Sequence, residues 1–425
     1  MPRKMKGLTA GSVLVLLLSI AAIIGLIVFL QAAGNDSPAA SMRLEEIAGA
    51  EGQALQVPDN SATELPERTA QVSAGIQSAA PQANTVFDYA PVSVTMTLGG
   101  MLRFESDVVA SQSFASNGQS ILAPLTARLQ ADLIIMGSDQ AVAVDRKAND
   151  TLMPLDALDL IKQAGINTLV LAGGNILDGG LPPAQRTLDA LDARGIRPIG
   201  LGDGKVTNFR VNGLTVAWLH ASDRLSAAGR KATADSQRAA YMTAYDVDQL
   251  IEQVTSLKEQ ADIVAVSLNW QSSSGQTPTA DQRTAAHRLG QAGADLIVGM
   301  GGEQVQNMEL YQLKGSGQES RDVLIAYGLG NILTENRSKR ERLSGTLLHI
   351  ALTYDPRQKS VHYDSLSYTP TYVRKWTALG RQHFQVLLSA ETPPDDMSKT
   401  QRDQMSRCFQ LIRNAFLGSS ATLQR

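Results

Sequence analysis

Glycines, polar side chains and one tryptophan follow the apolar runs of this sequence. The side chains that could take part in chemistry are three carboxylates, three amides and one indole. The seven candidates are Asp139, Asn175, Asp178, Asn269, Trp270, Glu303 and Asn331. Each comes directly, or a few residues, after an apolar run that we predict to be a strand. Because ligands of α/β domains bind at the carboxyl ends of the strands, we expect these side chains to line one pocket.

These seven side chains fit few kinds of catalytic or cofactor site. Asp139, Asp178 and Glu303 carry oxygens of the kind that Ca²⁺ or Mg²⁺ prefers, but the neighbouring glycines bring no further side-chain ligand, so we expect no metal and no other cofactor. No strand is followed by a G-x-G-x-x-G motif or by a Walker lysine, which argues against a nucleotide site. Ser138 and Ser267 lie near strand ends without a histidine in a recognisable motif, so a catalytic triad is not predicted.

Trp270 lies between two amides, Asn269 and Gln271. An aromatic ring with flanking amides is able to form a platform for a sugar or a peptide. The simpler interpretation is a half-buried tryptophan that fills the rim of the sheet with its polar edge hydrogen-bonded.

One pattern recurs along the chain and sets the fold class. A helical ending, a small or acidic breaker and four to six mostly apolar residues follow one another in LTARLQADLIIMG, LIKQAGINTLVLAG, LKEQADIVAVSLNW and LGQAGADLIVGMGG. Continuous apolar runs bounded by helices are typical of parallel strands that are buried on both faces. We therefore predict an α/β layered sandwich, with one mixed sheet or with two sheets and helices outside.

Other segments predict local elements. Residues 92–98 alternate as a strand does, and Asn212-Gly213 between two apolar runs predicts a hairpin over 209–219. Further strands, expected to be antiparallel, are predicted over 322–327, 343–354 and 360–368. A helix is predicted over 398–417, where Ser398 caps the start, Gly418 follows the end, and the apolar stripe consists of Met405, Cys408, Phe409, Ile412 and Phe416.

The N-terminus predicts a membrane anchor. Residues 1–7 contain Arg3, Lys4 and Lys6, and residues 8–31 form an uncharged apolar segment longer than the roughly 20 residues that cross a bilayer. A signal peptide has a shorter apolar region, of about 7–15 residues. The basic residues before the segment place residues 1–7 in the cytoplasm and the body outside the cell, so we expect a single-pass membrane protein.

Composition limits the partners. Residues 32–90 are rich in Ala, Ser, Gln, Glu and Pro, which predicts a disordered linker. A short helix over 41–50 is an alternative for that part of it. The net charge of −3 gives no sign of nucleic-acid binding, and the single cysteine excludes an intrachain disulfide. The basic run at 337–342 is expected to be solvated, with an acidic polymer or an anionic lipid as the alternative partner.

Five segments, in order, resemble the capsule-synthesis CapA/PgsA family. They are ADLIIMGSDQ, AGINTLVLAGGNILDGGLPPAQRTLDALDARGIRPIGLG, ADIVAVSLNWQ with PTADQRTAAHRL, GADLIVGMGGEQVQNMELY and AYGLGNIL. The resemblance covers residues 92–372 and implies a calcineurin-like metallophosphoesterase-type fold. With it, the body divides into a CapA-like domain over 91–390 and a helical tail over 391–425.

The resemblance also implies that the metal site of the family is degenerate here. Where the family has metal-binding or polar side chains, this chain has Gly100 for an Asp, Asp139 for a Glu, Gly173 and Gly174 for two Asn, Asn175 and Asn269 for two His, and Met300, Gly301, Gly302 and Glu303 for a His-His-Pro-His cluster. None of the five histidines falls at a ligand position.

What the resemblance implies about function is a role in the biosynthesis, export or surface retention of a capsule or of poly-γ-glutamate. The expected mechanism is binding or scaffolding without catalysis, and the expected partners are an anionic capsule polymer or capsule-assembly proteins. Two alternatives stay open: a hydrolase of phosphoester or amide bonds that uses Asp139, Asp178 and Glu303 with a recruited cation, and an assembly subunit that acts through its C-terminal helix.

Overall fold

The computed structural model describes residues 90–116, 119–143, 151–171, 173–202, 205–270, 275–313 and 320–420. The predicted anchor at 8–31, the helix at 41–50 and all of the linker except its last residue lie outside these ranges. Within them, no helix has both the length and the apolar character that crossing a membrane requires.

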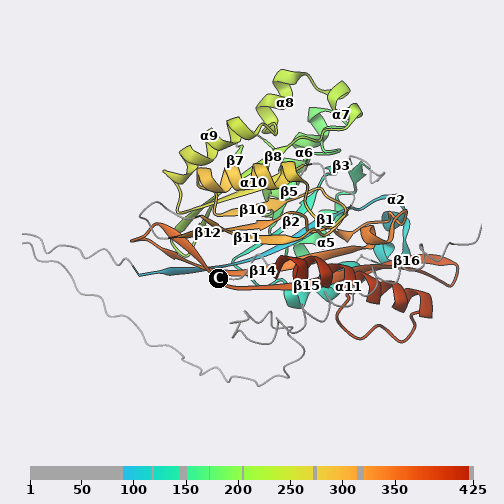
Figure 1. The fold of residues 1–425 in the computed structure, drawn as a ribbon. Coiled ribbons are helices and arrows are strands. Elements are labelled where there is room, and N and C mark those ends of the chain that lie inside the picture. Colours follow the sequence, from blue (N-terminus) through green and yellow to red (C-terminus); the bar gives the residue numbers. More distant parts are fainter. Residues whose placement is uncertain are drawn as a thin grey trace, which may run out of the picture. The chain divides into compact units, whose positions relative to one another are not determined.

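Two large sheets form the centre of the fold (Figure 1). The first has the order β16-β15-β14-β1-β2-β5-β6, with β13 beside β1. Its strands are β1 (Val92–Leu102), β2 (Leu133–Ser138), β5 (Thr168–Leu171), β6 (Arg197–Ile199), β13 (Asn331–Leu333), β14 (Ser344–Asp355), β15 (Ser360–Ala378) and β16 (Arg381–Leu388). The run β1-β2-β5-β6 is parallel, and β14, β15 and β16 extend it in antiparallel fashion.

The second sheet has the order β11-β12-β10-β9-β8-β7. Its strands are β7 (Val206–Val211), β8 (Leu214–Ser222), β9 (Ile263–Asn269), β10 (Leu296–Gly299), β11 (Met308–Leu313) and β12 (Arg321–Ala326). The four inner strands are parallel, and each edge strand is antiparallel to its neighbour. A small pair, β3 (Ala141–Val142) and β4 (Leu152–Met153), stands apart.

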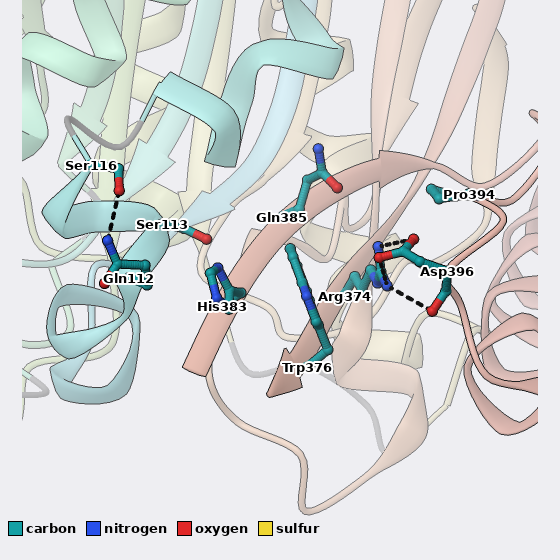
Figure 2. A pocket seen from close by; sticks show the side chains of 9 residues that line it. All are labelled: Gln112, Ser113, Ser116, Arg374, Trp376, His383, Gln385, Pro394 and Asp396. Carbon is teal, nitrogen blue, oxygen red and sulfur yellow. Dashed lines mark hydrogen bonds and ion pairs between the residues drawn. The ribbon is translucent and has the colours of Figure 1, made fainter. Parts of the chain in front are cut away.

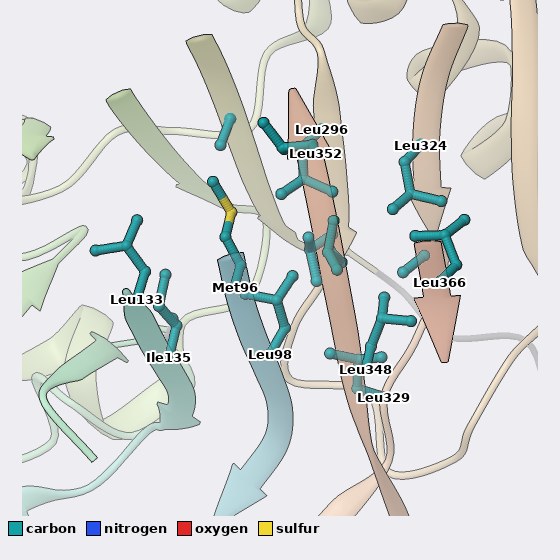
Figure 3. Packing of buried hydrophobic residues seen from close by; sticks show 14 of the residues in the cluster. Met96, Leu98, Leu133, Ile135, Leu296, Leu324, Leu329, Leu348, Leu352 and Leu366 are labelled. Carbon is teal, nitrogen blue, oxygen red and sulfur yellow. The ribbon is translucent and has the colours of Figure 1, made fainter. Parts of the chain in front are cut away.

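Apolar side chains from both sheets meet in one core. Met96, Leu98 and Leu348 of the first sheet pack in the same cluster as Leu296 and Leu324 of the second (Figure 3). The outer face of each sheet has its own buried cluster, shared with helices. The alternation of inward and outward apolar residues on strands covered on both faces explains why these strands read as continuous apolar runs.

Helices cover the outer faces. On the first sheet lie the short helices α2 (Ser106–Ala110), α3 (Gln112–Ala115) and α4 (Gln119–Leu122), the 3₁₀ helix η1 (Ala123–Arg128), and α5 (Asp156–Gln163) and α6 (Leu181–Asp192); on the second lie α9 (Val247–Lys258) and α10 (Ala280–Ala292). Two short helices, α7 (Ala227–Ala232) and α8 (Asp235–Tyr241), precede α9. The predicted α/β mixed-sheet sandwich is confirmed, in its two-sheet form.

Of the local predictions, the hairpin is confirmed and the direction of one strand is partly wrong. Asn212 (φ 51°) and Gly213 (φ 89°) form the two-residue turn of the β7–β8 hairpin, as predicted. The strand at 322–327 was expected to be antiparallel, and this is wrong for one of its two partners: β12 is parallel to β10 and antiparallel only to β11. The apolar pattern shows that a strand is buried and does not show the direction of its neighbours.

The C-terminal helix α11 (Lys399–Ser420) is present where the apolar stripe predicts it. Ser398 caps it through a hydrogen bond from the backbone N–H of Gln401. Cys408 lies on the buried side, and burial raises the pKa of its thiol to about 12. Gly418 does not end the helix, because the helical backbone continues to Ser420. A glycine that lies within the last turn of a helix lacks the left-handed conformation that ends one.

Candidate functional site

The carboxyl ends of β1 and β2 bring together an ion pair that is the centre of the site. Arg103 follows β1 directly, and its Nη2 donates to Oδ2 of Asp139 over 3.1 Å, just past the end of β2. Nδ2 of Asn175, in the loop after β5, donates to the same oxygen over 3.3 Å. The other carboxylate oxygen, Oδ1, is buried and has no hydrogen-bond partner among the described residues.

A second carboxylate approaches Arg103 from the other sheet. Oε1 of Glu303, in the loop after β10, lies 3.7 Å from Nη1 of Arg103, and Oε2 lies 2.7 Å from Nη2 of Arg342. Arg342 belongs to the 3₁₀ helix η2 (Arg340–Leu343). Nδ2 of Asn331, at the start of β13, donates to the backbone oxygens of Glu303 (3.4 Å) and Arg342 (3.0 Å), and Asn336 donates to Oε1 of Glu303 over 3.3 Å. Arg103, Asp139, Asn175, Glu303, Asn331 and Arg342 are called the strand-end cluster below.

The charges of the strand-end cluster balance, with two guanidinium groups against two carboxylates. Burial by itself lowers the pKa of Arg103, but the nearby Asp139, Glu105 and Glu303 outweigh it and raise that pKa above its ordinary value. Glu105 is buried beside the cluster, and burial raises its pKa although Thr334 (2.8 Å) and the backbone N–H of Glu335 (2.6 Å) both donate to it. Arg103 is therefore held in its charged form between carboxylates.

Three of the seven predicted residues lie outside the cluster. Asp178 lies in the loop before α6 and accepts a hydrogen bond from the hydroxyl of Ser226. Trp270 is buried rather than half-buried: its Nε1 donates to the backbone oxygen of Tyr327 over 3.2 Å and its ring stacks on that tyrosine, so it offers no platform. Asn269 is also buried, and its side chain packs against Gly301, two residues before Glu303.

The site includes residues that the sequence reading missed. Arg103 was not proposed because an arginine is no metal ligand, although a charged residue directly after a buried strand marks the same sheet edge as Asp139 does. Arg342 belongs to the run 337–342, which was expected to be solvated. That expectation holds for Ser338, Lys339 and Arg340, which are exposed, and is wrong for Arg342, which is half-buried against Glu303.

A serine and a histidine do meet in the fold, inside the second sheet. Nδ1 of His220 lies 2.9 Å from Oγ of Ser267, and Nε1 of Trp218 donates to that same oxygen over 3.0 Å. All three are buried, and burial lowers the pKa of His220 to about 4. A nucleophilic serine must reach its substrate, so this pair is a core contact.

The sequence model of the family described as bacterial capsule synthesis protein PGA_cap matches residues 73–336, more than half of the chain. The chain belongs to this family. A "PGA biosynthesis protein CapA" of Bacillus subtilis (strain 168) is 25% identical over 227 residues, which are 52% of this chain and 56% of the relative. A "Capsule biosynthesis protein CapA" of Bacillus anthracis is 27% identical over 187 residues, which are 42% of each chain. The chain thus spans about half the length of the curated relatives it matches.

Solved structures give a weaker likeness. A phosphatase from Mycoplasma pneumoniae has 14% identity and a TM-score of 0.38, with 66% of this chain and 94% of that chain covered. The calcineurin-like phosphoesterase YfkN from Bacillus subtilis has 9% identity and a TM-score of 0.36, with 76% and 99% covered. Likeness at this level carries no argument about the site.

The described residues do not fit the metal pair that the resemblance to the CapA/PgsA family implies. Among them, no three His, Cys, Asp or Glu side chains are grouped so that they could hold a metal ion. Each of the two carboxylates in the cluster already binds a guanidinium group. A hard cation needs many oxygen ligands, and Gly100, Gly173, Gly174, Gly301 and Gly302, where the resemblance implies polar or metal-binding side chains, offer none from a side chain.

The space for a side chain at three of these glycines is also closed. A Cβ on Gly100 would lie 2.1 Å from the backbone oxygen of Gly330, and a Cβ on Gly174 would lie 2.8 Å from Oδ2 of Asp139. Gly301 has a φ of 81°, and its Cβ would lie 2.3 Å from Oδ1 of Asn269. A side chain at any of these three positions would therefore meet the backbone or a neighbouring side chain.

Proposed function

We propose that this chain is a non-catalytic member of its family that acts by binding or scaffolding in the biosynthesis or surface retention of a capsule polymer such as poly-γ-glutamate. The observation that carries the proposal is the place of Arg103. Its guanidinium group supplies positive charge between Asp139 and Glu303, where a hydrolase of this fold would need metal ions.

Arg103 is a poor substitute for a metal ion in catalysis. It lowers the energy of the buried Asp139 and of the partly exposed Glu303, but it has no open coordination position at which a water molecule is activated. A divalent ion that entered the cluster would have to separate Arg103 from both carboxylates. The residual-carboxylate hydrolase is the weaker alternative for that reason, and because Asp178, one of its three carboxylates, is hydrogen-bonded to Ser226 and not to the strand-end cluster.

The same groups suit the binding of an acidic, amide-linked polymer. Arg342 is half-buried and Asn336 lies beside it, so both have donors left for a ligand at the rim of the cluster. Arginine pairs with carboxylates in a fixed two-pronged geometry, and amide side chains both donate to and accept from amide bonds.

We further propose that residues 8–31 anchor the chain in the cell membrane with the body outside the cell. The proposal is supported by the length of the apolar segment and by the basic residues that precede it. A body held on the outer surface by the long linker would meet an exported polymer there. The assembly-subunit alternative keeps the anchor and gives the binding role to α11.

The test uses the purified full-length protein. After dialysis against Mg²⁺, Ca²⁺, Mn²⁺ or Zn²⁺, we expect no stoichiometric metal and no hydrolysis of phosphate esters or of poly-γ-glutamate. Stoichiometric metal that Asp139→Asn removes, together with hydrolysis, would overturn the non-catalytic role.

A binding experiment tests the polymer. In titrations with poly-γ-glutamate, Arg342→Ala should weaken binding about tenfold, the effect expected for a charged hydrogen bond worth about 1.5 kcal/mol. The matched control is Arg357→Ala, which removes an exposed arginine from the β14–β15 turn. If the two variants bind alike, the strand-end cluster is not the polymer site.

A further inference from the structure

A pocket of about 430 Å³ lies away from the strand-end cluster, between α3, the β15–β16 hairpin and the loop before α11 (Figure 2). Its lining consists of Gln112, Ser113, Ser116, Arg374, Trp376, His383, Gln385, Pro394 and Asp396. The last six of these lie beyond residue 336, where the match to the family ends. The pocket is therefore built mainly by a part of the chain outside the family match.

The antiparallel register of β15 and β16 builds one wall. It places Arg374 opposite Gln385 and Trp376 opposite His383, and the alternation of side chains along a strand puts all four on one face of the hairpin. The rings of Trp376 and His383 stack with centroids 4.9 Å apart, and the guanidinium carbon of Arg374 lies 4.1 Å from the centroid of the Trp376 ring. Figure 2 shows the three side chains as a row, with Trp376 in the middle.

The charges of this lining cancel. The side chain of Arg374 is only 3% exposed, and it donates twice to Asp396, over 3.0 and 2.9 Å. Asp396, whose side chain is 65% exposed, is the charged group nearest to solvent. An acidic ligand would meet this carboxylate first and would gain little from an arginine whose charge is already paired.

Hydrogen-bonding groups remain available in the pocket. The amide of Gln385, the indole N–H of Trp376 and the ring nitrogens of His383 make no hydrogen bond to any described residue. The hydroxyl oxygens of Ser113 and Ser116 accept from the N–H of Phe384 (3.1 Å) and from Gln112 (2.9 Å), so their protons are left to donate. The lining thus offers both donors and acceptors beside an aromatic stack.

We propose that this pocket binds a neutral sugar unit of a glycan. A hydroxyl group both donates and accepts, so a sugar ring uses a mixed set of amide, hydroxyl, indole and imidazole groups without bringing a charge. The size agrees, because pockets that bind small ligands are about 300–1,000 Å³ and this one is about 430 Å³.

The experiment titrates the full-length protein with glucose, galactose, N-acetylglucosamine and their β-1,4-linked disaccharides by calorimetry. We expect at least one of these sugars to bind with a dissociation constant of about 1 mM or below. Gln385→Ala should weaken that binding about fivefold to tenfold, as the loss of a hydrogen bond to a neutral ligand predicts. Gln382→Ala is the matched control, because Gln382 is exposed on the opposite face of the same strand.

Three results would overturn the proposal. One is the absence of binding by every sugar up to about 20 mM. Another is equal binding by wild type and Gln385→Ala; if that variant does not fold, Ser116→Ala, which changes an exposed side chain, replaces it in the comparison. The third is a poly-γ-glutamate oligomer that displaces the sugar, which would show that the pocket takes an anion. None of these results bears on metal binding at the strand-end cluster, so the two proposals fail separately.

Discussion

Replacing Arg103 by alanine removes the positive charge at the centre of the strand-end cluster. Asp139 would be left buried, with a side chain only 6% exposed and with Asn175 as its remaining side-chain donor. Glu303 would keep Arg342. The variant therefore tests whether Arg103 is a structural counter-ion of the carboxylates or an incidental neighbour.

The size of the effect follows from the geometry. Two unit charges about 4 Å apart attract by about 4 kcal/mol at an effective dielectric constant of about 20, and removal of one partner from a buried pair costs about 3–5 kcal/mol. Arg103 is partly open to solvent, with 17% of its side chain exposed, so we expect the low end, about 3 kcal/mol of unfolding free energy. Arg103→Lys keeps the charge but loses the fork that reaches both carboxylates, and should cost about 1 kcal/mol.

Thermal and urea unfolding of the full-length protein measure this. At about 2.1 cal/mol/K per residue, a body of about 330 residues unfolds with an entropy of about 0.7 kcal/mol/K, so 3 kcal/mol lowers the midpoint by about 4 °C. The control is Arg194→Ala, which breaks a pair of similar geometry with the half-exposed Asp159 and should cost about 1 kcal/mol or less. If Arg103→Ala is no more destabilising than this control, Arg103 does not take the place of a metal ion between the carboxylates. The argument for a non-catalytic site then loses its basis.

Two further predictions concern the closed space around the site and the buried histidine. Gly100→Ala should destabilise the fold by about 3 kcal/mol or more in thermal unfolding, because its Cβ meets the backbone oxygen of Gly330, whereas Gly275→Ala, whose Cβ meets nothing within 4 Å, should be nearly neutral. The pKa of His220 falls from the ordinary 6.5 to about 4 in the folded state, so the unfolded chain binds the proton first and stability is lost as the pH falls from about 6.5 to about 4. Burial also lowers the pKa of His349 to about 4, so that residue contributes in both proteins. In urea unfolding the wild type should lose close to 3 kcal/mol more than His220→Gln over this pH range; an equal pH dependence of both proteins would contradict the prediction.

The architecture was largely predictable from local patterns. The helix-then-strand repeats indicated parallel strands, and Asn212-Gly213 indicated the tight hairpin, because each pattern depends on neighbouring residues alone. The direction of β12 and the end of α11 were not predictable in the same way. Which strand lies beside which, and where a helix loses its packing partners, depend on contacts between segments far apart in the sequence.

The site was predictable in its location and not in its chemistry. Asp139 and Glu303 were both expected at the carboxyl ends of parallel strands, and the structure places them on either side of Arg103, although they follow strands of different sheets. Arg103 was not predicted, because an arginine side chain does not bind metal ions. Trp270 illustrates the converse error: its position after a strand was informative, but only the packing of Tyr327 shows that the ring is not available to a ligand.

Two features argue against a metal ion in the strand-end cluster: the glycines have no space for a side chain, and Arg103 brings positive charge. The two together are a stronger argument than either alone. A divalent ion placed about 4 Å from Arg103 would be repelled by about 8 kcal/mol at an effective dielectric constant of about 20, since two charges on the ion double the interaction of unit charges. Removing Arg103 would relieve that repulsion, but the position of Gly100 still admits no carboxylate, because the backbone of Gly330 lies against it. Restoring a donor there, in turn, would leave the guanidinium group in place. We therefore expect that a metal centre at this cluster would require at least two changes, each of which alone destabilises the fold.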